Sequence, residues 1–301
     1  MSSTAQAALY SNTSSASEVC SQATTPANVQ IKPRNRSHDI AQALEGEWLD
    51  NNAFLTAVFN GMSITFPAGE KFFIDSVRHF GNDIADPTLK EHIRGFCGQE
   101  GFHRREHERY NQELCRRRGY DLDYLEGRLE RNIERAKKML SPLEQLASTA
   151  ALEHITAIMA ESGLSPDNPM IQSQDPAMQA LWDWHAAEEM EHKSVAFDVY
   201  RAVGGDEKLR KRALRQATFF LFVDILGGLI HMLRRDQQLW SWRNWKEGFQ
   251  FLFAQGGILR RIWPAYKDYF RDGFHPWQRD TEDLLNHWRE SQGEALVVSA
   301  S

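Results

Sequence analysis

Hydrophobic residues recur at every third or fourth position through most of the chain, which predicts amphipathic helices rather than strands. Pro, Gly and short polar segments separate the periodic stretches and mark where helices start and stop. The predicted helices are a lead-in helix at 39–60, one with Pro67 in its first turn, one from Asp86-Pro87 to Gly119, one at 121–138, one starting at Ser141-Pro142, and one at 177–203. We therefore expect an all-α fold in which four of these helices form a bundle, with the charged 121–138 helix as a crossover.

Two of the helices place carboxylates and imidazoles where a bundle helix normally has apolar residues. In the last helix, positions 182, 185, 189, 192, 196 and 199 step by 3 and 4 in alternation, and Glu189 and His192 occupy two of them. In the second helix the same stepping from 93 to 110 carries Glu100 and His103. Burying these side chains without partners is expensive, and a metal is the simplest partner that satisfies them all.

Two further helices carry a single acid in the apolar seam, Glu70 in the first and Glu153 in the third. The order is then Glu, Glu-x-x-His, Glu, Glu-x-x-His, with similar spacing in the two halves. This is the arrangement of dimetal sites in ferritin-like four-helix bundles. The alternative of solvated surface charges fits the arginines and acids at 104–108, but not acids in phase with apolar positions.

His107 and His185 are further candidates, one turn after His103 and one turn before Glu189 respectively. If the crossover makes the second and third helices parallel and the fourth antiparallel, both lie on the same side of the metals, about 5 Å along the axis. We expect one to be an added ligand and the other to support a ligand or face the substrate. The alternative is that both are buried histidines that fix ligand orientation. His154 points about 100° away from the acid before it and is expected to be structural.

Composition sets the broad class. The chain has 301 residues, 42% hydrophobic content and a net charge of −6, so it can build a core and lacks the basic balance of a nucleic-acid binder. The predicted organisation is a disordered tail at 1–38, the dimetal bundle at 39–205, a helical extension packed on it at 206–292, and a flexible tail at 293–301. The first tail lacks the apolar run of a secretory signal, so we expect a cytoplasmic protein.

The extension differs in composition from the bundle. Residues 206–279 contain 14 Lys or Arg and 7 Asp or Glu, so 14 − 7 gives a local charge of +7. The apolar run at 219–233 is short for a membrane-spanning helix and contains Asp224, which we expect to pair with a base such as Arg215 or Arg235 or to lie near the metals. The functional interpretation is a basic, aromatic surface for peripheral membrane contact or an apolar substrate, and the alternative is simple packing against the bundle.

The segments FPAGEKFF, CGQEGFHRREHERYN, ALEHITA and WHAAEEMEHKSVAFDVY resemble a bacterial family labelled predicted metal-dependent hydrolases, placed within the ferritin-like superfamily. The resemblance covers roughly residues 40–270 and departs at none of the six ligand positions. It implies His107 and His185 as part of the family pattern, and it implies as metal ligands Glu70, Glu100, His103, Glu153, Glu189 and His192.

The ligand types then suggest a reaction. Four carboxylates and two imidazoles suit two iron ions, with manganese or a mixed pair as alternatives. We expect a di-iron oxidoreductase that uses O₂ and an electron donor to oxidise a small apolar substrate, because hydrolytic sites usually leave more open coordination. The alternatives are a two-metal hydrolase with a bridging water, following the family label, and a ferritin-like protein that handles iron or peroxide. A second copy of the chain is a further candidate partner, in a homodimer.

Overall fold

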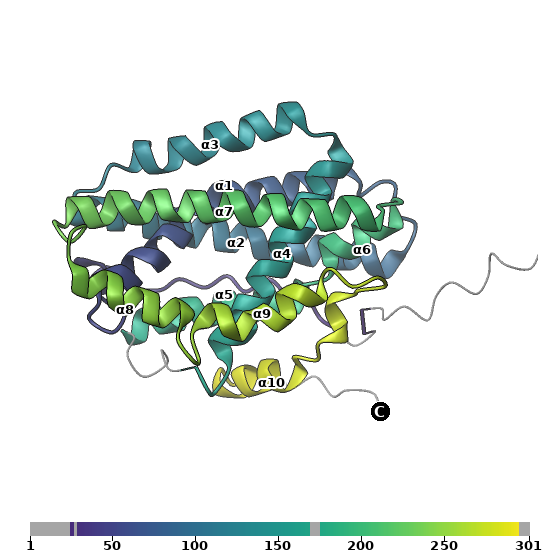
Figure 1. Ribbon diagram of the computed structural model, residues 1–301. Helices are drawn as coiled ribbons and strands as arrows, with labels where there is room; N and C mark the ends of the chain where they lie inside the picture. Colours follow the sequence, from purple (N-terminus) through teal and green to yellow (C-terminus); the bar gives the residue numbers. More distant parts are fainter. Residues whose placement is uncertain (1–24, 27–28, 169–174, 295–301) are drawn as a thin grey trace, which may run out of the picture.

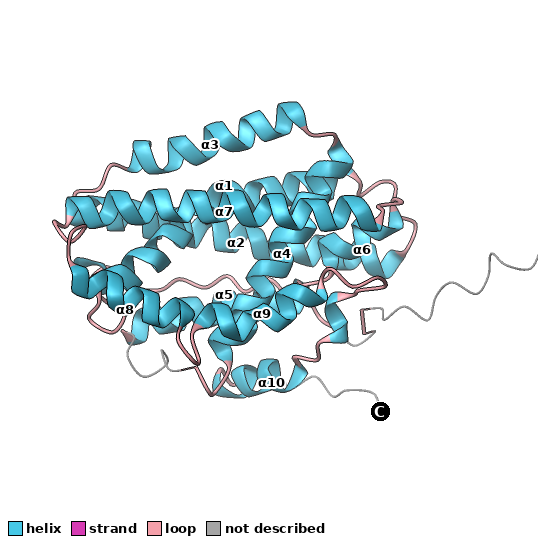
Figure 2. Cartoon of the chain, in the orientation of Figure 1, coloured by secondary structure: helices cyan, strands magenta, loops and turns pink. Residues whose placement is uncertain are grey.

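The computed structural model describes residues 25–26, 29–168 and 175–294, and these contain helices, turns and no strand (Figure 2). The α-helices are α1 (Ala53–His79), α2 (Pro87–Arg118), α3 (Leu122–Met139), α4 (Pro142–Leu164), α5 (Pro176–His192), α6 (Val195–Ala202), α7 (Glu207–Arg235), α8 (Trp242–Phe253), α9 (Ile258–Asp268) and α10 (Glu282–Ser291). Short 3₁₀ turns lie at Ala43–Glu45 and Pro276–Gln278. The predicted all-α class is confirmed.

The four helices that carry the predicted ligands, α1, α2, α4 and α5, lie together inside the molecule (Figure 1). Their ends use the caps that the sequence indicates. Asp86 caps α2, Gly119 ends it in the left-handed conformation at φ 67°, and Ser141 forms a capping box with Glu144 at the start of α4. The crossover helix α3 runs outside the bundle from the end of α2 to the start of α4, and α7 packs across α1 and α4 (Figure 1).

Two hydrophobic clusters fill the bundle on either side of the predicted ligands. On α1, Ile64 belongs to one cluster and Phe73 to the other, and Glu70 lies between them. On α2 the order along the chain is reversed: Phe96 belongs to the same cluster as Phe73, and Tyr110 to the same cluster as Ile64. The polar level is therefore enclosed by apolar packing at both ends.

The start of α1 differs from the prediction. The helix begins at Ala53 rather than near Pro67, and it absorbs the second half of the expected lead-in helix. Pro67 lies inside the helix, where its missing N–H leaves the Ser63 carbonyl without its usual partner. The Asn111 amide of α2 donates to that carbonyl over 3.1 Å. A side chain from another helix thus compensates for the proline, which the local sequence pattern cannot reveal.

The predicted helix at 177–203 is also interrupted, between α5 and α6 at Lys193 and Ser194. The Lys193 ammonium donates to the Arg279 carbonyl over 2.7 Å and to the Thr281 hydroxyl over 3.0 Å. The Ser194 hydroxyl accepts from the Trp277 indole over 3.1 Å. These bonds tie the break to the C-terminal part of the chain, directly after the last predicted ligand.

The predicted N-terminal tail ends earlier than residue 38. Residues 29–38 pack on α2 so closely that a Cβ atom at Gly95 would collide with the backbone of Ile31, and one at Gly98 with the Pro33 ring. This contact therefore requires glycine at these two positions of α2. Residues 1–24, 27–28 and 295–301, where the rest of the two predicted tails lies, are outside the described residues.

Candidate metal centre

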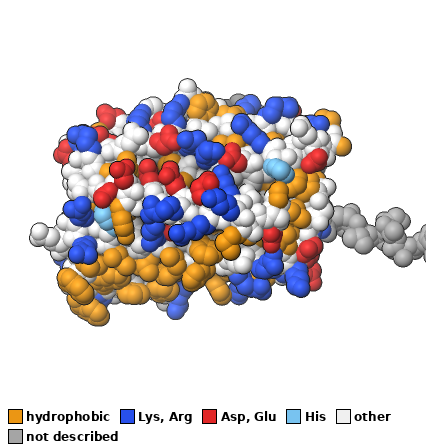
Figure 3. All heavy atoms as spheres, turned by 90° about the horizontal axis from the view of Figure 1, so that it is seen from above, with side chains coloured by type: hydrophobic (Ala, Val, Ile, Leu, Met, Phe, Trp, Pro, Cys, Tyr) orange, Lys and Arg blue, Asp and Glu red, His pale blue; other side chains and the backbone are white. Residues whose placement is uncertain are grey.

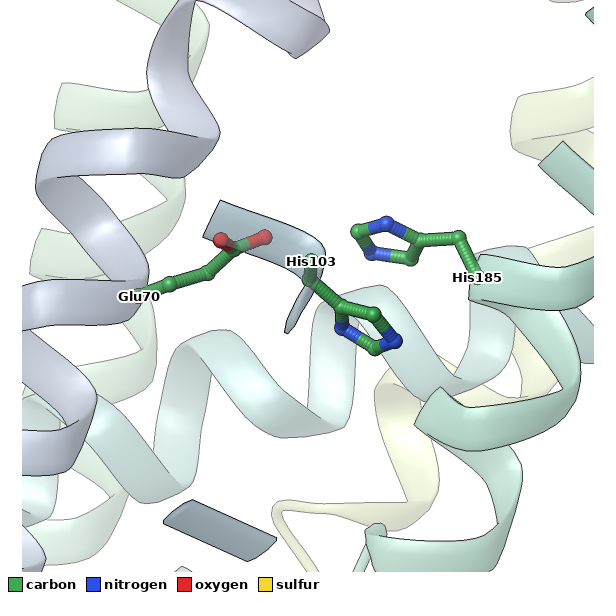
Figure 4. A group of neighbouring side chains, drawn as sticks. All are labelled: Glu70, His103 and His185. Carbon is green, nitrogen blue, oxygen red and sulfur yellow. The ribbon is translucent and has the colours of Figure 1, made fainter. Parts of the chain in front are cut away.

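The six predicted ligands come together from four helices. Glu70 is on α1, Glu100 and His103 on α2, Glu153 on α4, and the remaining pair on α5. All six are buried, with at most 4% of their surface exposed. Figure 4 shows the Glu70 carboxylate and the rings of His103 and His185 converging from three helices.

Their donor atoms form three overlapping groups. Within each group the atoms lie within 4.8 Å of one another, close enough to share one metal ion. Glu100 and His103 each belong to two of these groups. Glu189 lies between the two imidazoles, since its carboxylate oxygens are 3.5 Å from His103 Nδ1 and 3.6 Å from His192 Nε2. The groups are Glu70 with His103 and His185, Glu100 with Glu153 and His192, and Glu100 with His103 and Glu189.

The residues fit a metal because their polar atoms are otherwise unsatisfied. Both carboxylate oxygens of Glu70, Glu100 and Glu153 are buried without a hydrogen-bond partner among the described residues. His192 Nε2 lies 3.1 Å from a Glu100 oxygen and 3.2 Å from a Glu153 oxygen, but makes no aligned hydrogen bond with either. Native interiors rarely leave so many polar atoms unpaired in one place. Cations between them satisfy all of these atoms, and the oxygen and nitrogen donors suit a hard or borderline ion.

The site groups also perturb one another's proton affinity. Burial and the neighbouring Glu100 raise the pKa of Glu153 to about 8, and the same two causes hold the pKa of Glu70 well above its ordinary value. Burial disfavours a charge on His103, but adjacent carboxylates raise its pKa to about 10. Burial alone would raise the pKa of Glu189, yet the surrounding imidazoles hold it well below normal. Such opposed shifts are typical of functional sites.

His107 and His185 do lie on the same side of the centre, joined to each other. His107 Nε2 is 2.9 Å from His185 Nδ1, and His107 Nδ1 is 2.9 Å from Ser63 Oγ. The Ser63 hydroxyl donates to Asn111 Oδ1 over 2.7 Å, so it accepts from His107. His107 Nε2 then accepts from His185, which leaves His185 Nε2 with a free lone pair beside Glu189, 3.2 Å away. This geometry favours His185 as the additional ligand and His107 as the residue that orients it.

Both histidines are held neutral, in keeping with these tautomers. Burial, together with the charge on His103, lowers the pKa of His185 to about 4. Burial and the neighbouring His185 lower the pKa of His107 well below its ordinary value. Phe66 stacks on His185 and meets His107 edge-on, with ring centroids 4.7 Å apart in both cases. An aromatic wall, completed by Trp182, therefore closes this side of the centre.

A second set of residues, which sequence reasoning missed, supports His192. The Gln99 side-chain oxygen lies 2.9 Å from His192 Nδ1, which directs Nε2 toward the ligand oxygens. The Gln99 amide donates to Glu191 over 2.8 Å, and Glu191 also accepts from Arg289 of α10 over 2.7 Å. Partners of this kind fix the tautomer and orientation of ligating histidines.

The Glu188 carboxylate lies beside His103 on the side away from Glu189. One Glu188 oxygen lies 3.0 Å from His103 Nε2, which leaves Nδ1 toward the centre, and the other accepts from Arg34 over 3.2 Å. A signal was available, because the segment AAEEMEH carries more acids than the ligand seam uses. Arg34 lies in the segment predicted to be a disordered tail, and no sequence pattern indicates its role.

Two other candidates lie away from the centre. His154 Nε2 is 3.2 Å from the Ala265 carbonyl, consistent with a structural role. Asp224 accepts from Arg128 of α3 over 2.8 Å and from Asn132 over 3.3 Å. It therefore pairs with the crossover helix, and the expected pairing with Arg215 or Arg235, or a place beside the metals, is wrong.

Comparison with known proteins adds one finding. The family described as predicted metal-dependent hydrolase matches residues 32–280, which includes every residue of the candidate centre except Arg289. The match begins at the packed N-terminal segment and extends through α9. No significant match is found among curated proteins or solved structures.

Proposed function

Because the chain belongs to the family of predicted metal-dependent hydrolases, we propose that it is a two-metal hydrolase acting on a small organic substrate. The observation that supports this most directly is the cluster of buried carboxylate and imidazole atoms without hydrogen-bond partners. When bound, a metal pair supplies Lewis acidity and an activated water at neutral pH.

The chain's own residues have distinct tasks in this proposal. Glu70, Glu153, His103 and His192 would each hold a metal ion, and Glu100, which belongs to two of the donor groups, could serve both ions. The hydrogen-bonded His107 and His185 are neutral, so His185 can coordinate or accept a proton at Nε2. Phe66 and Trp182 exclude bulk water from this side and favour a substrate with an apolar part.

Oxidation with O₂ at a di-iron pair is the second candidate, and the donor set supports it. Carboxylates outnumber imidazoles, and seven protein side chains surround the centre when His185 is included. This leaves few open positions for substrate binding on a hydrolytic metal. In that case iron, O₂ and an electron donor would be required.

The two candidates separate under anaerobic conditions. Metal-free protein would be loaded with Mn(II), Fe(II) or Zn(II) and tested against carboxylic esters, amides and phosphate esters. The proposal predicts hydrolysis without O₂ that disappears in the Glu153→Gln variant. Glu161→Gln on the same helix is the matched control, because Glu161 pairs with Arg279 at the surface.

The outcome that contradicts hydrolysis is equally concrete. If no substrate is cleaved anaerobically, and the ferrous protein instead gives a transient optical band on mixing with O₂, the oxidation candidate replaces it. If neither occurs in metal-loaded protein, both candidates are wrong.

A further inference from the structure

The outer sides of α7, α8 and α9 carry exposed aromatic residues that the metal centre does not use. Trp242 is 80% exposed, Phe222 62% and Phe219 61%, values unusual for such large apolar side chains. Hydrophobic side chains gather along the lower margin of Figure 3, which is the front of Figure 1, where these three helices lie. We call this surface the aromatic face, and its residues are Phe219, Phe222, Val223, Ile230, Trp240, Trp242, Phe249, Phe253, Leu259 and Trp263.

Helix α7 has two different apolar sides. Leu214, Leu229 and Met232 are buried against the bundle, whereas Phe219, Phe222 and the other apolar residues of its outer side are exposed. Among the described residues, α7 is the helix long and apolar enough to cross a membrane, by length and composition only. Only 28% of its most apolar window is buried in the protein. It packs on α1 and α4, so it is placed to lie along an apolar surface rather than cross one.

The three helices form one continuous surface. Thr218 of α7 and Tyr266 of α9 are joined by a 2.9 Å hydrogen bond, and Trp263 stacks on Tyr266. On α8, Phe249 and Phe253 stack on each other and line an open groove of about 430 Å³ with Trp242 and Lys246. The groove is lined almost entirely by apolar atoms on the outside of the molecule.

Basic residues surround the aromatic face. Arg234 and Arg235 follow the exposed apolar side of α7, Lys246 lies on α8 and Arg260 on α9, and all four are exposed. None of them makes an ion pair with a residue that the structure describes. These four are among the 14 Lys and Arg of residues 206–279, where the local charge is +7. Exposed tryptophans flanked by Lys and Arg are the composition of interfacial membrane-binding segments.

We propose that the aromatic face docks the protein on the surface of an anionic lipid bilayer, with the aromatic side chains at the headgroup level and the basic residues at lipid phosphates. The charge of the surrounding basic residues favours an anionic lipid surface over a second copy of the chain as the partner of this face. In a two-fold dimer the same basic residues would face one another across the interface, and the like charges would repel. An anionic leaflet complements them instead.

Co-sedimentation of the full chain with vesicles tests this proposal. Vesicles of phosphatidylglycerol mixed with phosphatidylcholine should bind the protein, and phosphatidylcholine alone or added salt should weaken binding. Trp242→Ser/Phe249→Ser/Phe253→Ser should reduce the partition coefficient at least about tenfold. The matched control is Tyr124→Ser/Met139→Ser, which removes two exposed apolar side chains from α3, outside the aromatic face.

The opposing results are distinct. Circular dichroism and metal content first establish that both variants are folded. Equal vesicle binding by the triple variant and the wild type would overturn the proposal, as would no binding to anionic vesicles at low salt. A wild-type dimer in sedimentation analysis that the triple variant converts to monomer, without vesicle binding, would assign the face to a second copy.

Discussion

Arg34 binds Glu191 through two parallel hydrogen bonds of 2.8 Å each. The same carboxylate accepts from Gln99 of α2 and Arg289 of α10, so segments from both ends of the chain meet on one acid beside the metal centre. Glu191 is 1% exposed, and its charge is balanced almost entirely by these partners. The orientation of His192 therefore depends on a residue more than a hundred positions away in the sequence.

Arg34→Lys should weaken metal binding about tenfold to a hundredfold, because lysine cannot form the paired bonds that hold Glu191 and Gln99 behind His192. Metal competition with a chromophoric chelator measures this. Arg36→Lys is the control, since Arg36 bonds to Glu294 and Gln292 and not to Glu188 or Glu191. Equal affinities for the two variants would refute a positioning role for Arg34.

His107→Phe should keep its metals but bind the one nearest His185 about tenfold more weakly, because His185 loses the acceptor that fixes its tautomer. His185→Ala should weaken the binding of this metal further. Metal titration and the pH profile of any activity report both effects. Tyr110→Phe, one turn along α2 and bonded to Asn60, is the buried control. An unchanged titration in His107→Phe would show that the imidazole pair is incidental.

The metal-free protein should lose stability as pH rises from about 6.5 to about 8, and metal should stabilise it more at the upper end. The pKa of Glu153 is raised from 4.5 to about 8, so the folded protein retains a proton that the unfolded chain has released. The pKa of His103, raised to about 10, acts in the same direction above 6.5. His185, whose pKa is lowered to about 4, changes stability only below 6.5.

Thermal unfolding with and without Mn(II) across this pH range is the measurement. A metal-induced increase in Tm that stays constant or shrinks between pH 6.5 and 8 is incompatible with protons being displaced from the site. Glu153→Gln has no proton to release at this position, so its metal-induced increase in Tm should depend less on pH.

Asn111→Ala should cost about 1–3 kcal/mol of unfolding free energy, since it leaves the Ser63 carbonyl buried without a donor. The cost should shrink in a Pro67→Ala background, where residue 67 regains the N–H that bonds that carbonyl. Urea unfolding of the double-mutant cycle measures the difference. Additive effects would mean that the amide does not compensate for the proline.

The clustering of the acids and histidines of the candidate centre was predictable because helical periodicity is a local property. Glu70, Glu100, Glu153 and Glu189 stood out by being in phase with apolar neighbours, and the Glu-x-x-His spacing added the histidines. The caps at Asp86 and Ser141 were readable for the same reason. Local rules thus identified the helices and the face that each one buries.

Long-range contacts were not predictable from such patterns. Arg34 lies in a polar stretch without periodicity, and its position depends on the contact of 29–38 with α2 and on its bonds to Glu191 of α5. The sequence pattern around Pro67 predicts a helix start there, because the compensating Asn111 is on another helix. The partner of Asp224 is on the crossover helix, whose register against α7 depends on tertiary packing.

Metal stoichiometry tests the central claim most directly. Mass spectrometric metal analysis of the protein loaded with Fe(II) or Mn(II) should give about two ions per chain. Glu153→Gln and His192→Ala should each reduce that number, and Glu161→Gln should leave it unchanged. Two ions retained in both ligand variants, or no stoichiometric metal in the wild type, would contradict a dimetal centre at these residues.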